Sequence, residues 1–128
     1  MEPNLTNNQK IVLQTLEKSE QPLGAYSILF NIEKKGIKSP QQVYRALDKL
    51  IEIGAVHKIE SLNSYIACKH KNCSARESTS FLICQECQKV YELLEDDLSD
   101  KFLKLSKKSK FEYSTHNLEI FGICETCK

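Results

Sequence analysis

Residues 39–54 read SPQQVYRALDKLIEIG, a stretch that predicts one well-defined helix in the first half of the chain. Ser39 followed by Pro40 is typical of a helix start, because serine can cap the first turn and proline at the next position has no N–H to leave unbonded. Apolar residues then recur every three or four positions, as on the buried face of a helix. Since Gly54 is a typical stop, we expect this helix to run from Pro40 to about Ile53.

Two helical patterns precede this helix and two strand patterns follow it. The first helix begins at a capping box in residues 6–9, and the second opens at Gly24 and ends near the cationic, glycine-terminated segment 34–36. Residues 55–60 and 63–67 have the composition of two short strands joined by a polar turn. Three helices followed by a β-hairpin is the order of a winged helix.

The second half of the chain has a different pattern. It predicts strands at 81–83 and 89–93, a helix from Asp96 to about Lys108, and strands near 111–113 and 118–121. The acidic start and basic end of that helix suit the helix dipole. We therefore expect an α/β protein in two parts: a winged-helix domain at 1–67 and a small α/β domain at 68–128.

Composition excludes several classes of protein. The chain has 128 residues and a net charge of +1, which is not typical of an indiscriminate binder of polyanions. It lacks an apolar run of about 18 residues, and its polar start does not resemble a signal peptide, so we expect a cytoplasmic protein without a membrane partner. Paired catalytic carboxylates, phosphate-binding glycines and a Ser/His/Asp set are absent from the sequence, so we expect neither an enzyme nor a small organic substrate.

Two CxxC units, CQEC at 84–87 and CETC at 124–127, carry the clearest chemical signal. In a reducing compartment, cysteines in such spacing indicate metal binding or redox chemistry more than structural disulfides. A CxxC turn presents two thiolates on one side of a tetrahedron, and two such turns make a closed zinc site. We expect one structural zinc per chain, held by Cys84, Cys87, Cys124 and Cys127. The alternatives are two disulfides or a thiol-redox enzyme, although a redox CxxC usually lies in a βαβ context that is missing here.

Further motifs connect these elements to a known family. They are VYRALD at 43–48, HKIES at 57–61 with NSY at 63–65, FLIC at 81–84, and HNLE at 116–119 leading to GIC at 122–124. With them the chain resembles the ferric uptake regulator superfamily, and most closely its zinc uptake regulator branch. The resemblance implies a metal-responsive transcriptional repressor, with zinc as the expected metal. Such a repressor binds palindromic operator DNA as a homodimer through its winged helix, and its second domain is the dimerisation domain.

The resemblance also implies which residues contact DNA. The third helix enters the major groove in this family, and the matching contact residues are Tyr44 and Arg45. Arginine can bind a guanine edge through two hydrogen bonds, and an aromatic ring can pack on a thymine methyl group. One departure is Gln42, which replaces the threonine that usually precedes Val-Tyr-Arg.

A second, regulatory zinc is implied at the hinge between the domains. The matching ligands are His57, Cys68 and Glu92, and a mixed set of sulfur, nitrogen and oxygen donors suits tetrahedral zinc. The family's remaining ligand is a histidine from a histidine-rich run, which segment 74–80 does not contain. Glu77 holds that register and is the expected ligand. The alternatives on the same loop are His70 and Cys73.

His116 matches a ligand of the additional metal site in iron-type and peroxide-sensing relatives. Because the histidine-rich run is missing, we do not expect that site to be occupied here. An iron or peroxide sensor of the same family remains the alternative function. It would place control of DNA binding at His116 and not at Cys68.

Overall fold

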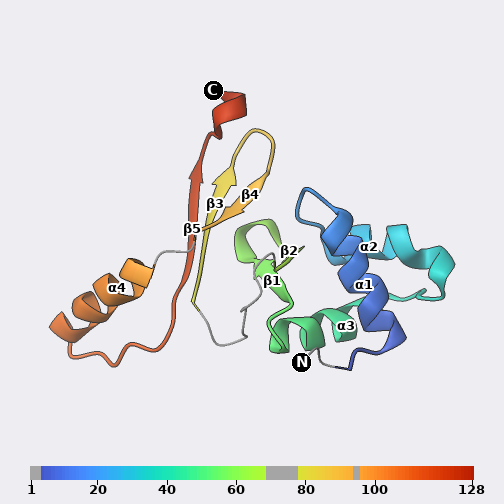
Figure 1. Cartoon of the computed structure of the whole chain (residues 1–128), viewed down its shortest axis with the longest axis horizontal. Coiled ribbons are helices and arrows are strands. Elements are labelled where there is room, and N and C mark those ends of the chain that lie inside the picture. The colour runs from blue at the N-terminus through green and yellow to red at the C-terminus, as the bar shows by residue number, and fades with distance from the viewer. Residues whose placement is uncertain (1–3, 69–77, 94–95) are drawn as a thin grey trace. The chain divides into compact units, whose positions relative to one another are not determined.

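Three helices and a β-hairpin form the N-terminal part of the computed structural model, which describes residues 4–68, 78–93 and 96–128 (Figure 1). The elements are α1 (Asn7–Lys18), α2 (Ala25–Ile32), the 3-10 turn Glu33–Lys35, α3 (Pro40–Glu52), β1 (Val56–Ile59), the 3-10 turn Glu60–Leu62 and β2 (Ser64–Ala67). This is the expected winged helix. The described residues after 77 form a second compact unit.

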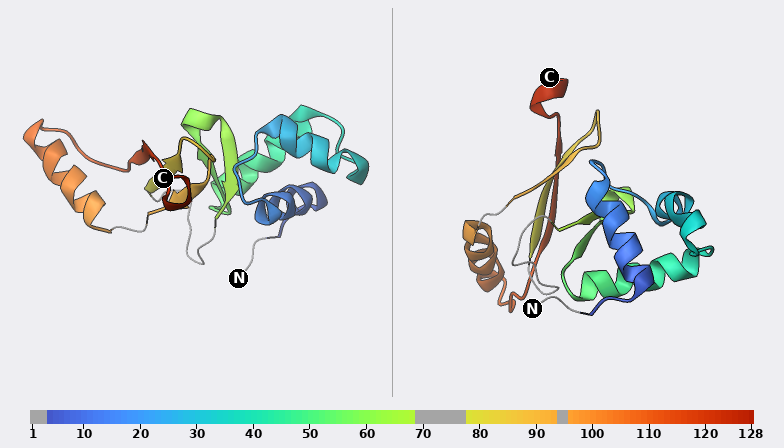
Figure 2. Two further views of the ribbon diagram at one scale, coloured as in Figure 1. Left: turned by 90° about the horizontal axis from the view of Figure 1, so that it is seen from above. Right: turned by 45° about the vertical axis from the view of Figure 1, so that its right-hand side comes forward.

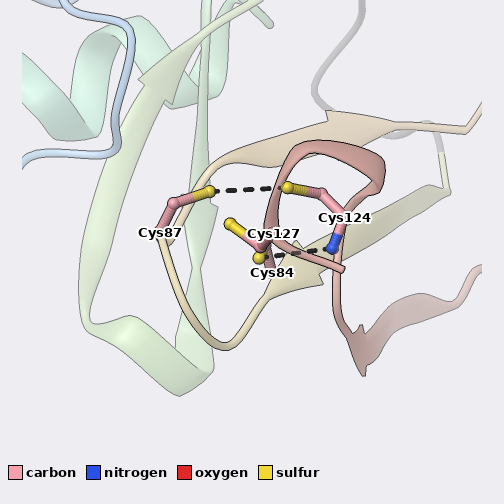
Figure 3. A group of neighbouring side chains, drawn as sticks. All are labelled: Cys84, Cys87, Cys124 and Cys127. Carbon is pink, nitrogen blue, oxygen red and sulfur yellow. Dashed lines mark hydrogen bonds between the residues drawn. The ribbon is translucent and has the colours of Figure 1, made fainter.

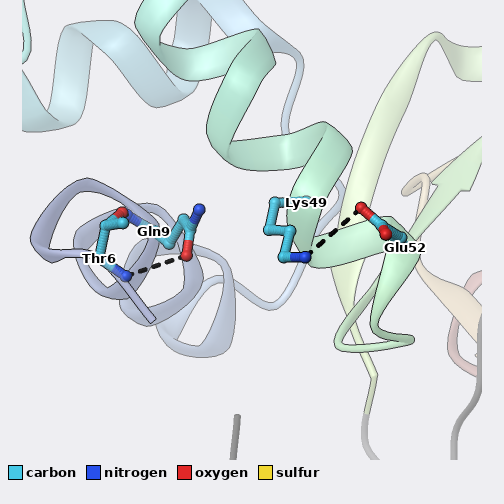
Figure 4. Close-up of polar contacts among 4 residues, drawn as sticks. All are labelled: Thr6, Gln9, Lys49 and Glu52. Atoms are coloured by element: carbon cyan, nitrogen blue, oxygen red, sulfur yellow. Dashed lines mark hydrogen bonds and ion pairs between the residues drawn. The ribbon is translucent and has the colours of Figure 1, made fainter. Parts of the chain in front are cut away.

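Reciprocal capping boxes begin both α1 and α3. The Gln9 backbone N–H donates to Thr6 Oγ1 at 3.2 Å, and the Thr6 N–H donates to Gln9 Oε1 at 2.9 Å (Figure 4). At α3 the Gln42 N–H donates to Ser39 Oγ, and Gln42 Oε1 accepts from the N–H groups of Ser39 and Lys38. These bonds satisfy first-turn N–H groups that have no partner inside a helix.

The helices and the hairpin share one apolar core. Its largest fully buried members come from all three helices, the loop after α2 and β1: Val12, Ile28, Ile32, Ile37, Val43, Leu47, Leu50 and Val56. Leu23 and Tyr65 exchange two backbone hydrogen bonds, of 3.0 and 2.8 Å. These two bonds attach β2 of the hairpin to the segment that leads into α2.

The C-terminal unit is a three-stranded mixed sheet with one helix. It contains β3 (Thr79–Cys84), β4 (Val90–Glu92), α4 (Asp96–Lys108), β5 (Asn117–Gly122) and the 3-10 turn Glu125–Cys127. The strand order is β4-β3-β5, with β4 antiparallel and β5 parallel to the central β3, and β3 and β5 run side by side in Figure 1 and in the right-hand view of Figure 2. The expected α/β unit is therefore confirmed. Of the described residues, no helix has the length and apolar character needed to cross a membrane.

The strand expected near 111–113 is wrong. Residues 111–116 have no regular secondary structure, and Lys110 adopts a left-handed conformation (φ 56°) directly after α4. Phe111 is 68% exposed, so this segment has no buried face to stabilise a strand. Tyr113 instead hydrogen-bonds to the Nδ1 atom of His116.

Leu47→Ala tests whether the α3 face controls the stability of the N-terminal unit. Leu47 is fully buried, so removing three carbons should leave a cavity and lower the free energy of unfolding by about 2–5 kcal/mol. Phe30→Ala is the matched control, because Phe30 is 80% exposed and its truncation should change stability by less than about 0.5 kcal/mol. Urea unfolding followed by circular dichroism measures both. Equal losses in the two variants would contradict the assignment.

Candidate metal centre and nucleic-acid interface

Four cysteine side chains converge at one end of the C-terminal sheet. Cys84 is the last residue of β3, Cys87 lies in the following turn, and Cys124 and Cys127 follow β5. The parallel register pairs Cys84 with Gly122, and the Gln85 N–H donates to Gly122 O at 2.8 Å. Strand pairing thus brings two CxxC units together that are far apart in the sequence, and Figure 3 shows their side chains pointing toward one another.

The spacing of the sulfurs suits a tetrahedral metal ion. All four Sγ atoms lie within 4.8 Å of one another, and Cys87 Sγ lies 3.7 Å from Cys124 Sγ. Thiolates about 2.3 Å from zinc in a regular tetrahedron are separated by roughly 3.8 Å. The four residues are free thiols, which does not match the alternative of two disulfides. The donor set therefore fits a closed structural zinc site.

Hydrogen-bond donors surround the sulfur of Cys124 and the sulfur of Cys84. Thr126 Oγ1 lies 3.3 Å from Cys124 Sγ, and the Cys124 N–H donates to Cys84 Sγ at 3.4 Å. Sequence reasoning did not single out Thr126. The hydroxyl at the third position of CETC was the available signal for it.

The four thiols have unequal acidity. Hydrogen bonding from Thr126 lowers the pKa of Cys124 to about 6, while hydrogen bonding with Cys124 raises the pKa of Cys127 to about 12. Sulfurs this close cannot all ionise without a compensating charge, so ionisation of Cys124 disfavours ionisation of Cys127. A bound divalent cation would supply that charge and release the remaining protons.

The outer face of α3 presents polar and aromatic side chains. Val43, Ala46, Leu47 and Leu50 are buried, whereas Gln41, Tyr44, Arg45, Asp48 and Lys49 are exposed. Tyr44 and Arg45, the two expected contact residues, are therefore accessible. Lys49 forms an i,i+3 ion pair with Glu52 at 3.6 Å (Figure 4). Gln42, the residue that departs from the family pattern, is turned back into the N-cap.

The expected hinge ligands lie in different parts of the chain. His57 is on β1, and Cys68 follows β2, where its N–H donates to Ala55 O at 2.8 Å. A ring nitrogen of His57 and Cys68 Sγ lie within 4.8 Å of each other. Cys68 is disulfide-bonded in this structure, so its sulfur must be reduced before it can bind a metal. Glu92 ends β4 in the C-terminal unit. Glu77, His70 and Cys73 lie outside the described residues.

His116 belongs to a cluster of hydroxyl groups. Its Nδ1 atom lies 2.6 Å from the Tyr113 hydroxyl and its Nε2 atom 3.2 Å from Ser80 Oγ, while its backbone N–H donates to Ser78 Oγ at 3.1 Å. Phe102 of α4 packs edge-on against the ring, with centroids 4.7 Å apart. Protein groups thus engage both ring nitrogens, and burial lowers the pKa of His116 below its usual value.

Comparison with known proteins gives consistent matches along the chain. The model of the ferric uptake regulator family matches residues 2–121. The zinc uptake regulation protein of Escherichia coli (strain K12) is 33% identical over 124 residues, which is 96% of this chain and 72% of that protein. A solved structure of a zinc uptake regulator complexed with zinc and DNA matches with a TM-score of 0.88 at 32% identity, over 97% of this chain and 83% of that one. The structure of holo XcZur matches with a TM-score of 0.87 at 34% identity, covering 99% and 88%.

The His116 cluster predicts a pH dependence of stability. Because the folded-state pKa of His116 is lowered, the unfolded chain takes up its proton first as the pH falls. This contribution to stability is therefore present above about pH 6.5 and is lost as the pH falls through the folded-state pKa. His116→Gln removes the titrating group. Between about pH 7.5 and pH 5.5, the wild type should lose more free energy of unfolding than the variant. Parallel pH profiles in urea titrations would contradict this.

Proposed function

Since the chain belongs to the ferric uptake regulator family, we propose that it is a zinc-responsive transcriptional repressor that binds a palindromic DNA operator as a homodimer. The observation that carries this function is the similarity, over 97% of the chain, to a regulator solved with both zinc and DNA. The Cys₄ cluster supports zinc as the metal, because closed all-thiolate sites are typical of structural zinc. We place this regulator in the cytoplasm and assign it no enzymatic activity.

We propose that the two halves of the chain have different functions. Residues 1–67 bind DNA, with Tyr44 and Arg45 on the exposed face of α3 as contact residues. Residues 68–128 hold the structural zinc through Cys84, Cys87, Cys124 and Cys127 and form the dimer. A metal bound at the end of β3 and β5 would clamp these two strands, so its binding energy would add to the folding of this small unit.

The sheet offers a surface for a second copy of the chain. β5 is an edge strand of the β4-β3-β5 sheet, and an edge strand can pair with another chain. Leu82, Tyr91 and Ile120 are register neighbours across the three strands, and all are more than one-third exposed. Burial of this apolar row is a reason for a twofold dimer. Such a dimer presents two recognition helices to a palindromic site.

We propose that a second zinc binds His57, Cys68 and Glu92, with Glu77 as the fourth ligand. The proposal rests on the family resemblance and on one short distance in the hairpin. The ring of His57, on β1, lies close to Cys68, which directly follows β2. These ligands belong to both halves of the chain, so zinc would select the arrangement that binds DNA. A coupling free energy of about 1–3 kcal/mol is typical of such control. The bonding of His116 to Tyr113 and Ser80 favours this site over control by iron at His116.

Cys87→Ser tests the structural zinc. The variant should lose about one zinc per chain, because three thiolates no longer close the tetrahedron, and the dimer should dissociate with it. Elemental analysis of the purified protein and light scattering after size-exclusion chromatography measure the two effects. Full retention of both zinc and dimer would remove these cysteines from the proposal. Ser109→Ala, in the turn after α4, is a control substitution that should change neither the zinc content nor the dimer.

Cys68→Ser tests the regulatory site, with the protein kept reduced. The variant should keep the Cys₄ zinc and the dimer, yet lose zinc-dependent operator binding, because only the linkage between metal and DNA is broken. Glu77→Ala should have the same effect more weakly. Operator titrations by fluorescence anisotropy, with and without a chelator, measure this. If zinc still controls DNA binding in both variants, the protein does not sense metal through these residues.

A further inference from the structure

Two neighbouring glutamines at the start of α3 have different environments. Gln42 is partly buried, and its side chain closes the capping box by accepting from the Ser39 and Lys38 N–H groups at 3.3 and 3.0 Å. Gln41 is exposed. Within the described part of the chain, no hydrogen bond or ion pair holds its side chain. The amide of Gln41 is therefore available to a ligand, whereas the amide of Gln42 is committed to the fold.

Gln41 shares a helical face with the two expected DNA contacts. Tyr44 and Arg45 follow it by three and four residues, a spacing that places side chains of one helix about 5–6 Å apart. Successive bases of one DNA strand are about 3.4 Å apart along the helix axis. If Arg45 contacts one base pair, Gln41 can reach a base one or two steps away.

The charges along α3 favour contact through its N-terminal half. The positive end of the helix dipole lies there, Lys38 precedes the N-cap, and Arg45 follows one turn later. The C-terminal half exposes the acidic Asp48 and Glu52, and the ammonium group of Lys49 is paired with Glu52. DNA phosphates should therefore approach the half of α3 that carries Gln41.

We propose that Gln41 is a specificity-determining residue that reads an adenine one or two base pairs from the base bound by Arg45. A glutamine amide carries one donor and one acceptor, which match the N7 acceptor and N6 donor of adenine in the major groove. This inference rests on the proposed function, because it requires operator binding through α3. Gln41 would then be a second base-reading side chain on α3, beside Arg45. Gln42 cannot take this role, because its amide is held in the N-cap.

The experiment compares the full-length, zinc-loaded wild type with Gln41→Ala and Gln42→Ala. An operator is first selected with wild-type protein from random duplexes, and each base pair is then changed singly. Gln41→Ala should bind the selected operator about 10- to 100-fold more weakly and lose discrimination at one A·T pair, while its affinity for random DNA stays unchanged. Gln42→Ala is the matched control, because it removes the same amide from the cap. It should lower the melting temperature and keep the base preference.

The possible outcomes are distinguishable. If Gln41→Ala keeps the wild-type preference at every position, or loses affinity equally for operator and random DNA, Gln41 does not read a base and the inference is overturned. If Gln41→Ala loses preference only at the base pair where Arg45→Ala also loses it, the assignment of a separate base is overturned. If wild-type protein selects no sequence with zinc present, the proposed function itself fails, and the inference fails with it.

Discussion

The parallel pairing of β3 with β5 is the interaction on which the C-terminal unit depends. It joins segments separated by α4 and aligns Thr79 to Cys84 with Asn117 to Gly122. That register brings the two CxxC units into one cluster at one end, and it places Ser78 and Ser80 beside His116 at the other. A shift of one residue would separate these groups and move the strand's apolar side chains to the opposite face.

The C-terminal unit has little core of its own. Among the described residues after 77, the buried ones are Ser80, Phe81, Ile83 and Cys84, which all belong to β3. Units of this size bury too small a fraction of their surface to be comfortably stable alone. A zinc ion at one end of the sheet and a partner chain along its apolar face would both contribute stability here. Metal binding and dimer formation should accordingly be linked to folding in this family member.

The N-terminal unit has a different role, which is to present a rigid helix to DNA. The inner face of α3 packs Val43, Leu47 and Leu50 into the core, and a capping box fixes the first turn of the helix. The backbone of the outer face is consequently held in place by the core and the cap. Gln42 lies beside the proposed contact residues Tyr44 and Arg45, but its side chain is held in the N-cap and is not available for DNA. The proposed base contact by Gln41 would leave this cap intact.

Local sequence by itself determined the helices, the hairpin and the cysteine pairs, whereas Tyr44 and Arg45 were identified through the family resemblance. Caps, glycine stops and hydrophobic periodicity act over a few residues, so they can be identified without the fold. By contrast, the Gln42 side chain accepts a hydrogen bond from the N-cap backbone, and this contact depends on a side-chain conformation that periodicity does not specify. The strand expected at 111–113 failed for a related reason, because a strand needs a partner and a buried face that local composition does not supply.

Only the tertiary structure decided which distant groups meet. The sequence predicted a Cys₄ cluster from two CxxC units, but the 3.7 Å approach of Cys87 to Cys124 and the hydrogen bond from the Cys124 N–H to Cys84 Sγ depend on strand pairing. The enclosure of His116 by Tyr113, Ser78 and Ser80 likewise joins residues up to 38 positions apart. Such contacts are non-local: they form only when the chain has folded and buried the groups that make them, and no short-range pattern encodes their partners.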